Sequence, residues 1–192
     1  MKRVLCFGDS NTYGYDPRSR LGSRYPAGIR WTGLLQSAGW EIVNCGQNGL
    51  CIPGKPRFPA VTGLLRRVGP DVAAVMLGSN DLLNGASAGE AAERMEALLR
   101  SMKENAGAAG ILLIAPPPMQ FGDWVRTQEL IDESIRLDGL YRALADKLGV
   151  AFAGAAAWGV ATAFDGVHFS PEGHAAFAAG LAAGLETMPQ GA

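Results

Sequence analysis

The sequence contains few cysteines and histidines for its length. Only three cysteines and two histidines occur in 192 residues. The odd set Cys6, Cys45 and Cys51 does not indicate a disulfide framework, and a zinc site would need more ligands at tighter spacing. We therefore expect reduced thiols, a cytoplasmic protein, and neither a metal nor a cofactor.

Long apolar runs and an excess of one charge are also missing. No stretch approaches the roughly 20 consecutive apolar residues of a membrane span, and the opening run Val4 to Phe7 is shorter than the roughly seven to fifteen residues of an export signal. Seventeen basic side chains stand against eighteen acidic ones, for a net charge of -1. We expect a small-molecule partner, with no nucleic acid and no membrane. Scattered apolar side chains in long loops allow a homo-oligomer.

Short apolar runs alternate with segments of helical periodicity along the whole chain. The pattern predicts strands at 4–7, 40–44, 72–77, 111–115 and 150–152, and helices at 29–37, 60–68, 87–105, 128–148 and 171–185. Near-continuous apolar strands that alternate with helices indicate a parallel sheet covered on both faces. We predict an α/β fold in one domain, residues 1–192: a three-layer α/β/α sandwich with a five-stranded parallel sheet.

Two helix starts carry readable capping chemistry. Ser87 followed by Glu90 forms a capping box, and Ser170 before Pro171 supplies an N-cap with proline in the first turn. Ser87 also lies in a G-x-S-x-G pattern, but ten residues separate it from the preceding strand, so it does not fit a nucleophile elbow. A partial phosphate-loop pattern around Lys55 is rejected because Pro56 replaces the magnesium-binding hydroxyl.

Ser10 directly follows the first apolar run, where open α/β folds place their ligands. A serine hydroxyl becomes a nucleophile when an imidazole takes its proton and a carboxylate orients that imidazole. Asp165 and His168 have the spacing for one turn to present both groups. The other histidine, His174, falls within the last predicted helix and is interpreted as structural or solvent-facing. Asp9 and Asp81 are interpreted as acceptors that fix loops.

Four sequence blocks together resemble the SGNH hydrolases, also called the GDSL esterases and lipases. The blocks are Gly8-Asp9-Ser10, Gly46, Gly78-Ser79-Asn80-Asp81 and Asp165-x-x-His168, in the family's order. Longer phrases such as Arg30-Trp31-Thr32-Gly33 and Ala115-Pro116-Pro117-Pro118 are similar to the bacterial arylesterase and acyltransferase branch. The chain departs from that branch around Gly46, where an acidic pair and an arginine-threonine stretch are absent, so we expect a different acyl or alcohol pocket.

The resemblance implies a role for each matching residue. Ser10 would be the nucleophile, His168 the base and Asp165 its orienting partner. The Ser10 and Gly46 N–H groups and the Asn80 side chain would form the oxyanion hole. Aromatic and methionine side chains near the loops are candidates for an apolar substrate pocket. They are Trp31, Met119, Phe121, Trp124 and Trp158.

These residues lead to one main hypothesis and two alternatives. The main one is a serine esterase that hydrolyses short-chain or aryl carboxylic esters through an acyl-enzyme and also transfers the acyl group to alcohols. The first alternative is removal of acetyl groups from a carbohydrate by the same chemistry. The second is a flavodoxin-like binding module without catalysis. This alternative does not explain the spacing of Asp165 and His168.

Overall fold

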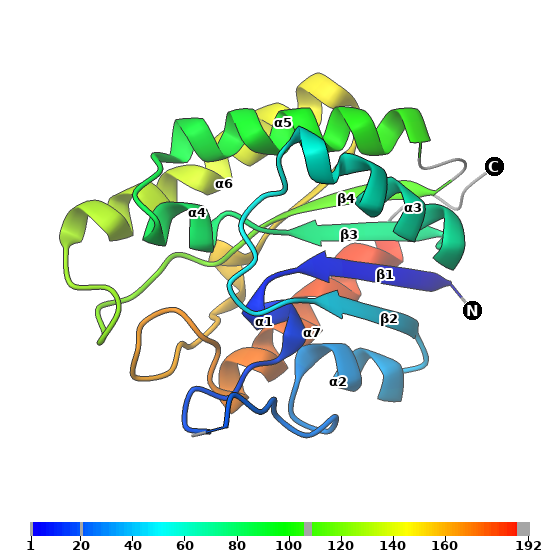
Figure 1. Cartoon of the computed structure of the whole chain (residues 1–192). Coiled ribbons are helices and arrows are strands. Elements are labelled where there is room, and N and C mark those ends of the chain that lie inside the picture. Colours follow the sequence, from blue (N-terminus) through cyan, green and yellow to red (C-terminus); the bar gives the residue numbers. More distant parts are fainter. Residues whose placement is uncertain (1, 20, 106–108, 188–192) are drawn as a thin grey trace.

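A computed structural model describes residues 2–19, 21–105 and 109–187 (Figure 1). The strands are β1 Arg3–Gly8, β2 Glu41–Gly46, β3 Val72–Met76, β4 Gly110–Ala115 and β5 Ala151–Gly154. The α-helices are α1 Ser10–Tyr13, α2 Trp31–Ser37, α3 Phe58–Val68, α4 Ser79–Leu83, α5 Ala88–Asn105, α6 Gln128–Leu148 and α7 Pro171–Thr187. Two 3₁₀ turns, η1 Lys55–Arg57 and η2 Ala155–Trp158, complete the order. The predicted α/β architecture is confirmed.

The five strands form one parallel sheet in the order β2-β1-β3-β4-β5. Side chains alternate across it, so that Leu5 and Phe7 of β1 enter one core while Val4 and Cys6 enter the other. Helices α3, α5 and α6 cover the first face, and α2 and α7 cover the second (Figure 1). The chain therefore has three layers, with the carboxyl ends of all strands at one edge.

The capping contacts at the starts of α5 and α7 are those that the sequence predicted. The Ser87 N–H donates to Glu90 Oε2 at 2.8 Å, and the Glu90 N–H donates back to Ser87 Oγ at 3.2 Å. Ser170 Oγ accepts the Gly173 N–H at 3.1 Å. Ser87 therefore belongs to the start of a helix rather than to a strand-end nucleophile turn.

No helix in the described part of the chain is long and apolar enough to cross a membrane. Two helices at the strand ends, α1 and α4, were not predicted. They have four and five residues, too few to produce a periodic apolar pattern. Both begin within three residues of a strand end, and they carry Ser10 and Asn80 respectively.

Candidate active site

Ser10 is the first residue of α1, directly beyond the carboxyl end of β1. The Asp9 side chain caps this helix by accepting the Asn11 N–H at 2.9 Å. Gly8 permits the tight turn, because a Cβ there would lie 2.1 Å from Thr12 Oγ1. Burial raises the pKa of Asp9 to about 6, against the opposing effects of the Asn11 hydrogen bond and of His168. The prediction that Asp9 fixes the loop is confirmed.

The structure brings Ser10, His168 and Asp165 into one line of contacts. His168 Nε2 lies 2.9 Å from Ser10 Oγ, and His168 Nδ1 lies 2.7 Å from Asp165 Oδ2. The second carboxylate oxygen of Asp165 accepts the N–H groups of Val167 and His168, each at 2.9 Å. Burial raises the pKa of Asp165, but the hydrogen bonds from the His168 ring and these amides outweigh it and hold the pKa below its usual value.

Asn11 connects α1 to the segment that carries His168, a role that the sequence did not predict. Its side-chain Nδ2 donates to the Val167 carbonyl at 3.1 Å, and its Oδ1 accepts the Phe169 N–H at 2.9 Å. The amide therefore holds the backbone on both sides of His168. The Asn11 carbonyl in turn accepts the Trp31 indole N–H at 2.8 Å. Asn11, the residue after Ser10, thus fixes the segment that carries the imidazole.

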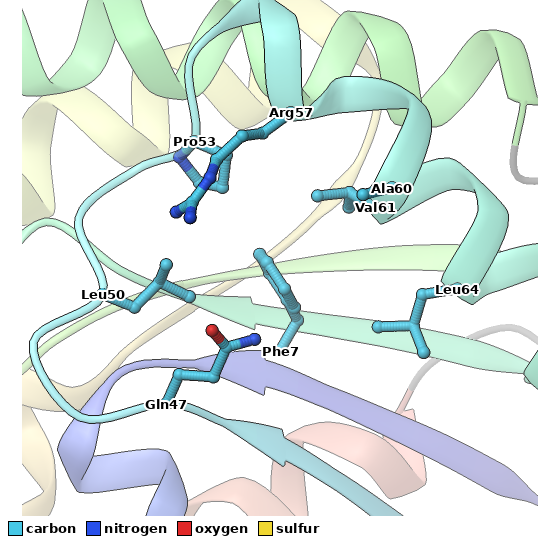
Figure 2. A pocket seen from close by; sticks show the side chains of 8 residues that line it. All are labelled: Phe7, Gln47, Leu50, Pro53, Arg57, Ala60, Val61 and Leu64. Carbon is cyan, nitrogen blue, oxygen red and sulfur yellow. The ribbon is translucent and has the colours of Figure 1, made fainter.

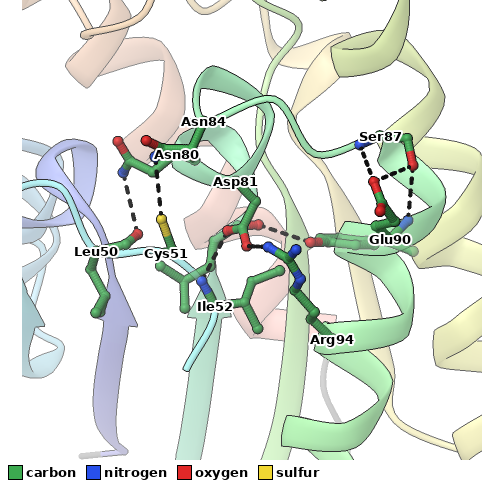
Figure 3. A network of polar contacts seen from close by, with 11 residues as sticks. Leu50, Cys51, Ile52, Asn80, Asp81, Asn84, Ser87, Glu90 and Arg94 are labelled. Carbon is green, nitrogen blue, oxygen red and sulfur yellow. Dashed lines mark hydrogen bonds and ion pairs between the residues drawn. The ribbon is translucent and has the colours of Figure 1, made fainter. Parts of the chain in front are cut away.

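Asn80 and Gly46, the two predicted oxyanion donors beyond Ser10, differ in their surroundings. The Asn80 amide donates to the Leu50 carbonyl at 3.2 Å, a contact that also appears in Figure 3. The Gly46 N–H already donates to Asn44 Oδ1 at 2.9 Å. A Cβ on Gly46 would lie 2.1 Å from the Tyr13 backbone nitrogen, so this glycine lets α1 approach β2. The structure therefore argues against Gly46 as a free donor.

The turn after Gly46 offers a different amide. In the described part of the chain, the Gly49 N–H has no hydrogen-bond acceptor. Gly49 has a φ of 72°, which favours glycine. Its neighbour Leu50 receives the Asn80 amide, so the turn lies beside that side chain. The sequence motif could not distinguish the two glycines, because the geometry of the turn decides which N–H stays open.

Asp81 fixes the loop after β2 to the helices above it (Figure 3). Its carboxylate is fully buried, accepts the Ile52 N–H at 2.9 Å and pairs with Arg94 at 3.0 Å. Asn84 Nδ2, one turn further along, donates to the Asn80 carbonyl at 2.6 Å and to Cys51 Sγ at 3.5 Å. The prediction of a loop-fixing role for Asp81 is confirmed.

Of the five predicted pocket residues, the structure places Trp124 beside the imidazole. Its ring centroid lies 5.0 Å from that of His168, and the side chain is 53% exposed. Tyr15, which was not predicted, lies on His168 as well, at 4.7 Å. The two aromatic rings therefore border the imidazole from separate loops.

The other four predicted pocket residues have no ring contact with His168 among the described residues. Trp31 is buried in the core between α2 and α7, so the prediction that it lines a pocket is wrong. Trp158 packs edge-on against Phe177 of that core, and Met119 is buried in the opposite core. Phe121 is 64% exposed. Apolar residue type alone did not separate core residues from residues at the site.

His174 is fully buried on α7. Its Nδ1 accepts the Trp31 N–H at 3.4 Å, and its ring packs against Tyr25 and Phe169. Burial, with the positive charges of Arg30 and His168, lowers its pKa to about 4. His174 is therefore a structural residue, and the solvent-facing alternative is excluded.

The fold and the Ser10, His168 and Asp165 contacts define an α/β/α protein of the serine hydrolase class. The sequence profile of the GDSL-like lipase/acylhydrolase family matches residues 6–176, and the chain belongs to this family. Family membership makes it a carboxylic ester hydrolase. The predicted resemblance to SGNH hydrolases is thereby confirmed.

Solved structures agree with this assignment along almost the full chain. A protein of Agrobacterium tumefaciens str. C58 assigned to the arylesterases is 30% identical, with a TM-score of 0.84 over 98% of this chain and 100% of its own. Est24, a carbohydrate acetylesterase from Sinorhizobium meliloti, is 28% identical, with a TM-score of 0.82 over 97% and 99%. The M. smegmatis aryl esterase is 25% identical, with a TM-score of 0.84 over 98% and 100%. No curated protein gave a significant match.

Proposed function

We propose that the protein hydrolyses short-chain or aryl carboxylic esters through an acyl-enzyme on Ser10. The observation that carries the proposal is the continuous contact from Ser10 Oγ through the His168 ring to Asp165, at 2.9 and 2.7 Å. His168 takes the Ser10 proton as the hydroxyl attacks the ester carbonyl, and the same nitrogen then protonates the leaving alcohol. Water then attacks the acyl-enzyme while His168 takes its proton, and His168 returns a proton to Ser10 Oγ as the carboxylic acid is released.

Charge on the carbonyl oxygen is stabilised by donors at the strand ends. We assign these to the Ser10 N–H, the Asn80 amide and the Gly49 N–H, the last in place of Gly46. Asn80 is held beside the turn by the Leu50 carbonyl, and the Gly49 N–H has no acceptor among the described residues. Fixed donors of this kind are typically worth about 100-fold to 1000-fold in kcat each.

The aromatic rings beside His168 support an aryl leaving group. Because the imidazole protonates the leaving oxygen, the alcohol part of the ester must lie next to His168. Tyr15 and Trp124 border that position, with centroids 4.7 and 5.0 Å from the imidazole. The same apolar border retains an alcohol in place of water, so acyl transfer to alcohols accompanies hydrolysis.

Removal of acetyl groups from a carbohydrate is the second candidate. It is favoured by the similarity to Est24 and by the exposed rings of Phe121 and Trp124, since such rings can stack on sugars. A panel of acetylated sugars and aryl acetates separates the two. Higher kcat/KM on the sugars, lost in Trp124→Ala, would favour this candidate.

Labelling with a fluorophosphonate tests the mechanism directly. We expect one adduct on Ser10, identified by peptide mass spectrometry, with none in Ser10→Ala and much slower labelling in His168→Asn. Ser87→Ala is the matched serine control and should label like the parent protein. A non-catalytic flavodoxin-like module predicts no adduct and ligand binding that is indifferent to Ser10→Ala, so labelling elsewhere or not at all would overturn the proposal.

We also propose a cytoplasmic location and a small-molecule partner, with neither nucleic acid nor membrane. Free thiols at Cys6, Cys45 and Cys51 support a reducing compartment, and the net charge of -1 supports a neutral partner. Self-association remains a prediction that light scattering can test.

A further inference from the structure

A cavity of about 210 Å³ lies on the α3 face of the sheet, below the loop that follows β2 (Figure 2). Its lining combines the ring of Phe7, side chains of the loop and the first turns of α3. The lining residues are Phe7, Gln47, Leu50, Pro53, Arg57, Ala60, Val61 and Leu64. Six of these eight are apolar, so the body of a ligand here must be apolar too.

Two polar side chains, both solvent-exposed, line this largely apolar space. Figure 2 shows the Arg57 guanidinium next to Pro53 and the Gln47 amide near Phe7, each on the rim of the same cavity. Among the described residues Arg57 has no ion-pair partner, and neither side chain has a hydrogen-bond partner. No carboxylate lines the cavity. A guanidinium without an ion-pair partner favours an anionic group, above all a carboxylate that accepts both N–H donors of the fork.

One residue separates this cavity from the oxyanion donors. The Leu50 carbonyl accepts the Asn80 amide at 3.2 Å, while the Leu50 side chain forms a wall of the cavity. On the other side, the Gln47 N–H donates to the Gly8 carbonyl at 3.0 Å, two residues before Ser10. The cavity is therefore built on the same turn that faces the reacting carbonyl.

We propose that this cavity is the acyl subsite and that it takes an acyl chain ending in a carboxylate, bound by Arg57 and Gln47. The inference rests on the proposed ester hydrolysis. The leaving group lies on the His168 side, between Tyr15 and Trp124, so the acyl chain extends on the side of Leu50. The volume holds on the order of seven non-hydrogen atoms at ~30 Å³ each. The substrate class is the half-ester of a dicarboxylic acid of about five or six carbons.

A pair of esters with the same chain tests the subsite. Mono-4-nitrophenyl adipate ends in a carboxylate, and 4-nitrophenyl methyl adipate carries the same chain capped as a neutral ester. We expect the protein to prefer the acid-terminated ester, and Arg57→Met to lower kcat/KM for it about 10-fold to 100-fold. The capped ester and 4-nitrophenyl acetate should change less than about twofold. Arg67→Met, on α3 but outside the cavity lining, is the matched control and should leave all three rates unchanged.

Binding without turnover separates this inference from the proposed function. Monomethyl adipate should bind Ser10→Ala protein in calorimetry, and the additional change Arg57→Met should abolish that binding. Monomethyl adipate should also slow fluorophosphonate labelling of the parent protein. Equal loss on both adipate esters in Arg57→Met, binding that survives this change, or binding that leaves labelling unaffected would overturn the subsite. Absence of any labelling or ester turnover would overturn the proposed function instead, while the calorimetry would still decide whether the cavity binds a carboxylate.

Discussion

At the residue scale, the site depends on a side chain that carries no reactive group. Asn11 is buried, and its amide contacts the backbone on both sides of His168, 156 and 158 residues away in sequence. The Asp165 carboxylate orients the imidazole ring, whereas Asn11 sets the distance of the whole segment from α1. Catalytic contacts are sensitive to such placement, since an error of about 1 Å can cost roughly 100-fold in rate.

We expect Asn11→Asp to reduce ester hydrolysis strongly. The new carboxylate can still accept the Phe169 N–H, but it cannot donate to the Val167 carbonyl and would repel it. We expect kcat to fall about 10-fold to 100-fold with KM changed little, because the displaced group acts in the chemical step. Steady-state kinetics on an aryl acetate provide the measurement. Asn105→Asp, at the end of α5, is the matched control, and an equal loss in both variants would contradict the positioning role.

The sequence pattern singled out the residues that we propose carry the chemistry, and it missed those that hold them in place. Ser10, Asp165 and His168 stand out because their residue types and spacing are unusual, and the structure brings them together. Asn11 and Tyr15 acquire their contacts with the His168 segment only when distant parts of the chain meet. Their roles depend on tertiary contacts, so no local sequence pattern reveals them.

At the element scale, short helices at the strand ends present the polar groups. The sequence predicted every strand and every long helix to within three residues at either end, because their apolar patterns extend over several turns or a whole buried strand. It missed α1 and α4, because helices of four and five residues are too short to show an apolar period. The Asp9 side chain caps α1, whereas α4 has no side-chain cap.

The capping box of α5 gives a prediction at this scale. Ser87→Ala removes the hydroxyl that accepts the Glu90 N–H at 3.2 Å. We expect the free energy of unfolding to fall by about 1 kcal/mol, as for other N-cap losses, with kcat/KM and fluorophosphonate labelling unchanged. Urea denaturation and kinetics on the same sample check both parts. Loss of activity without loss of stability would restore Ser87 as a nucleophile candidate.

At the scale of the whole molecule, two buried groups give folding opposite pH dependences. The pKa of Asp9 rises from 3.8 to about 6, so its stabilising contribution is complete below pH 3.8 and is lost as the pH rises through 6. The pKa of His174 falls from 6.5 to about 4, so its contribution is complete above pH 6.5 and is lost as the pH falls toward 4. Between pH 4 and 6 the two effects oppose each other.

Single variants should separate these two effects. Relative to the parent protein, Asp9→Asn should lose stability faster as the pH falls from 6.5 to 4, and His174→Asn should lose it more slowly. Each difference should reach about 2 kcal/mol across the window. Urea denaturation at pH 4.5, 5.5 and 6.5 provides the measurement. Asp132→Asn, on the exposed face of α6, is the control, and parallel curves for all three variants would contradict the assignment.

The sequence separation of 158 between Ser10 and His168 also determines when activity can arise during synthesis. A nascent chain that has emerged through α6 already carries the serine and Asn80, but it lacks the imidazole that activates the hydroxyl. We therefore expect ribosome-bound intermediates to hydrolyse esters far more slowly than the complete fold, however well their first strands have formed. Enzymatic turnover by this protein is consequently a late reporter of folding, which appears only when the last segments have docked against the first.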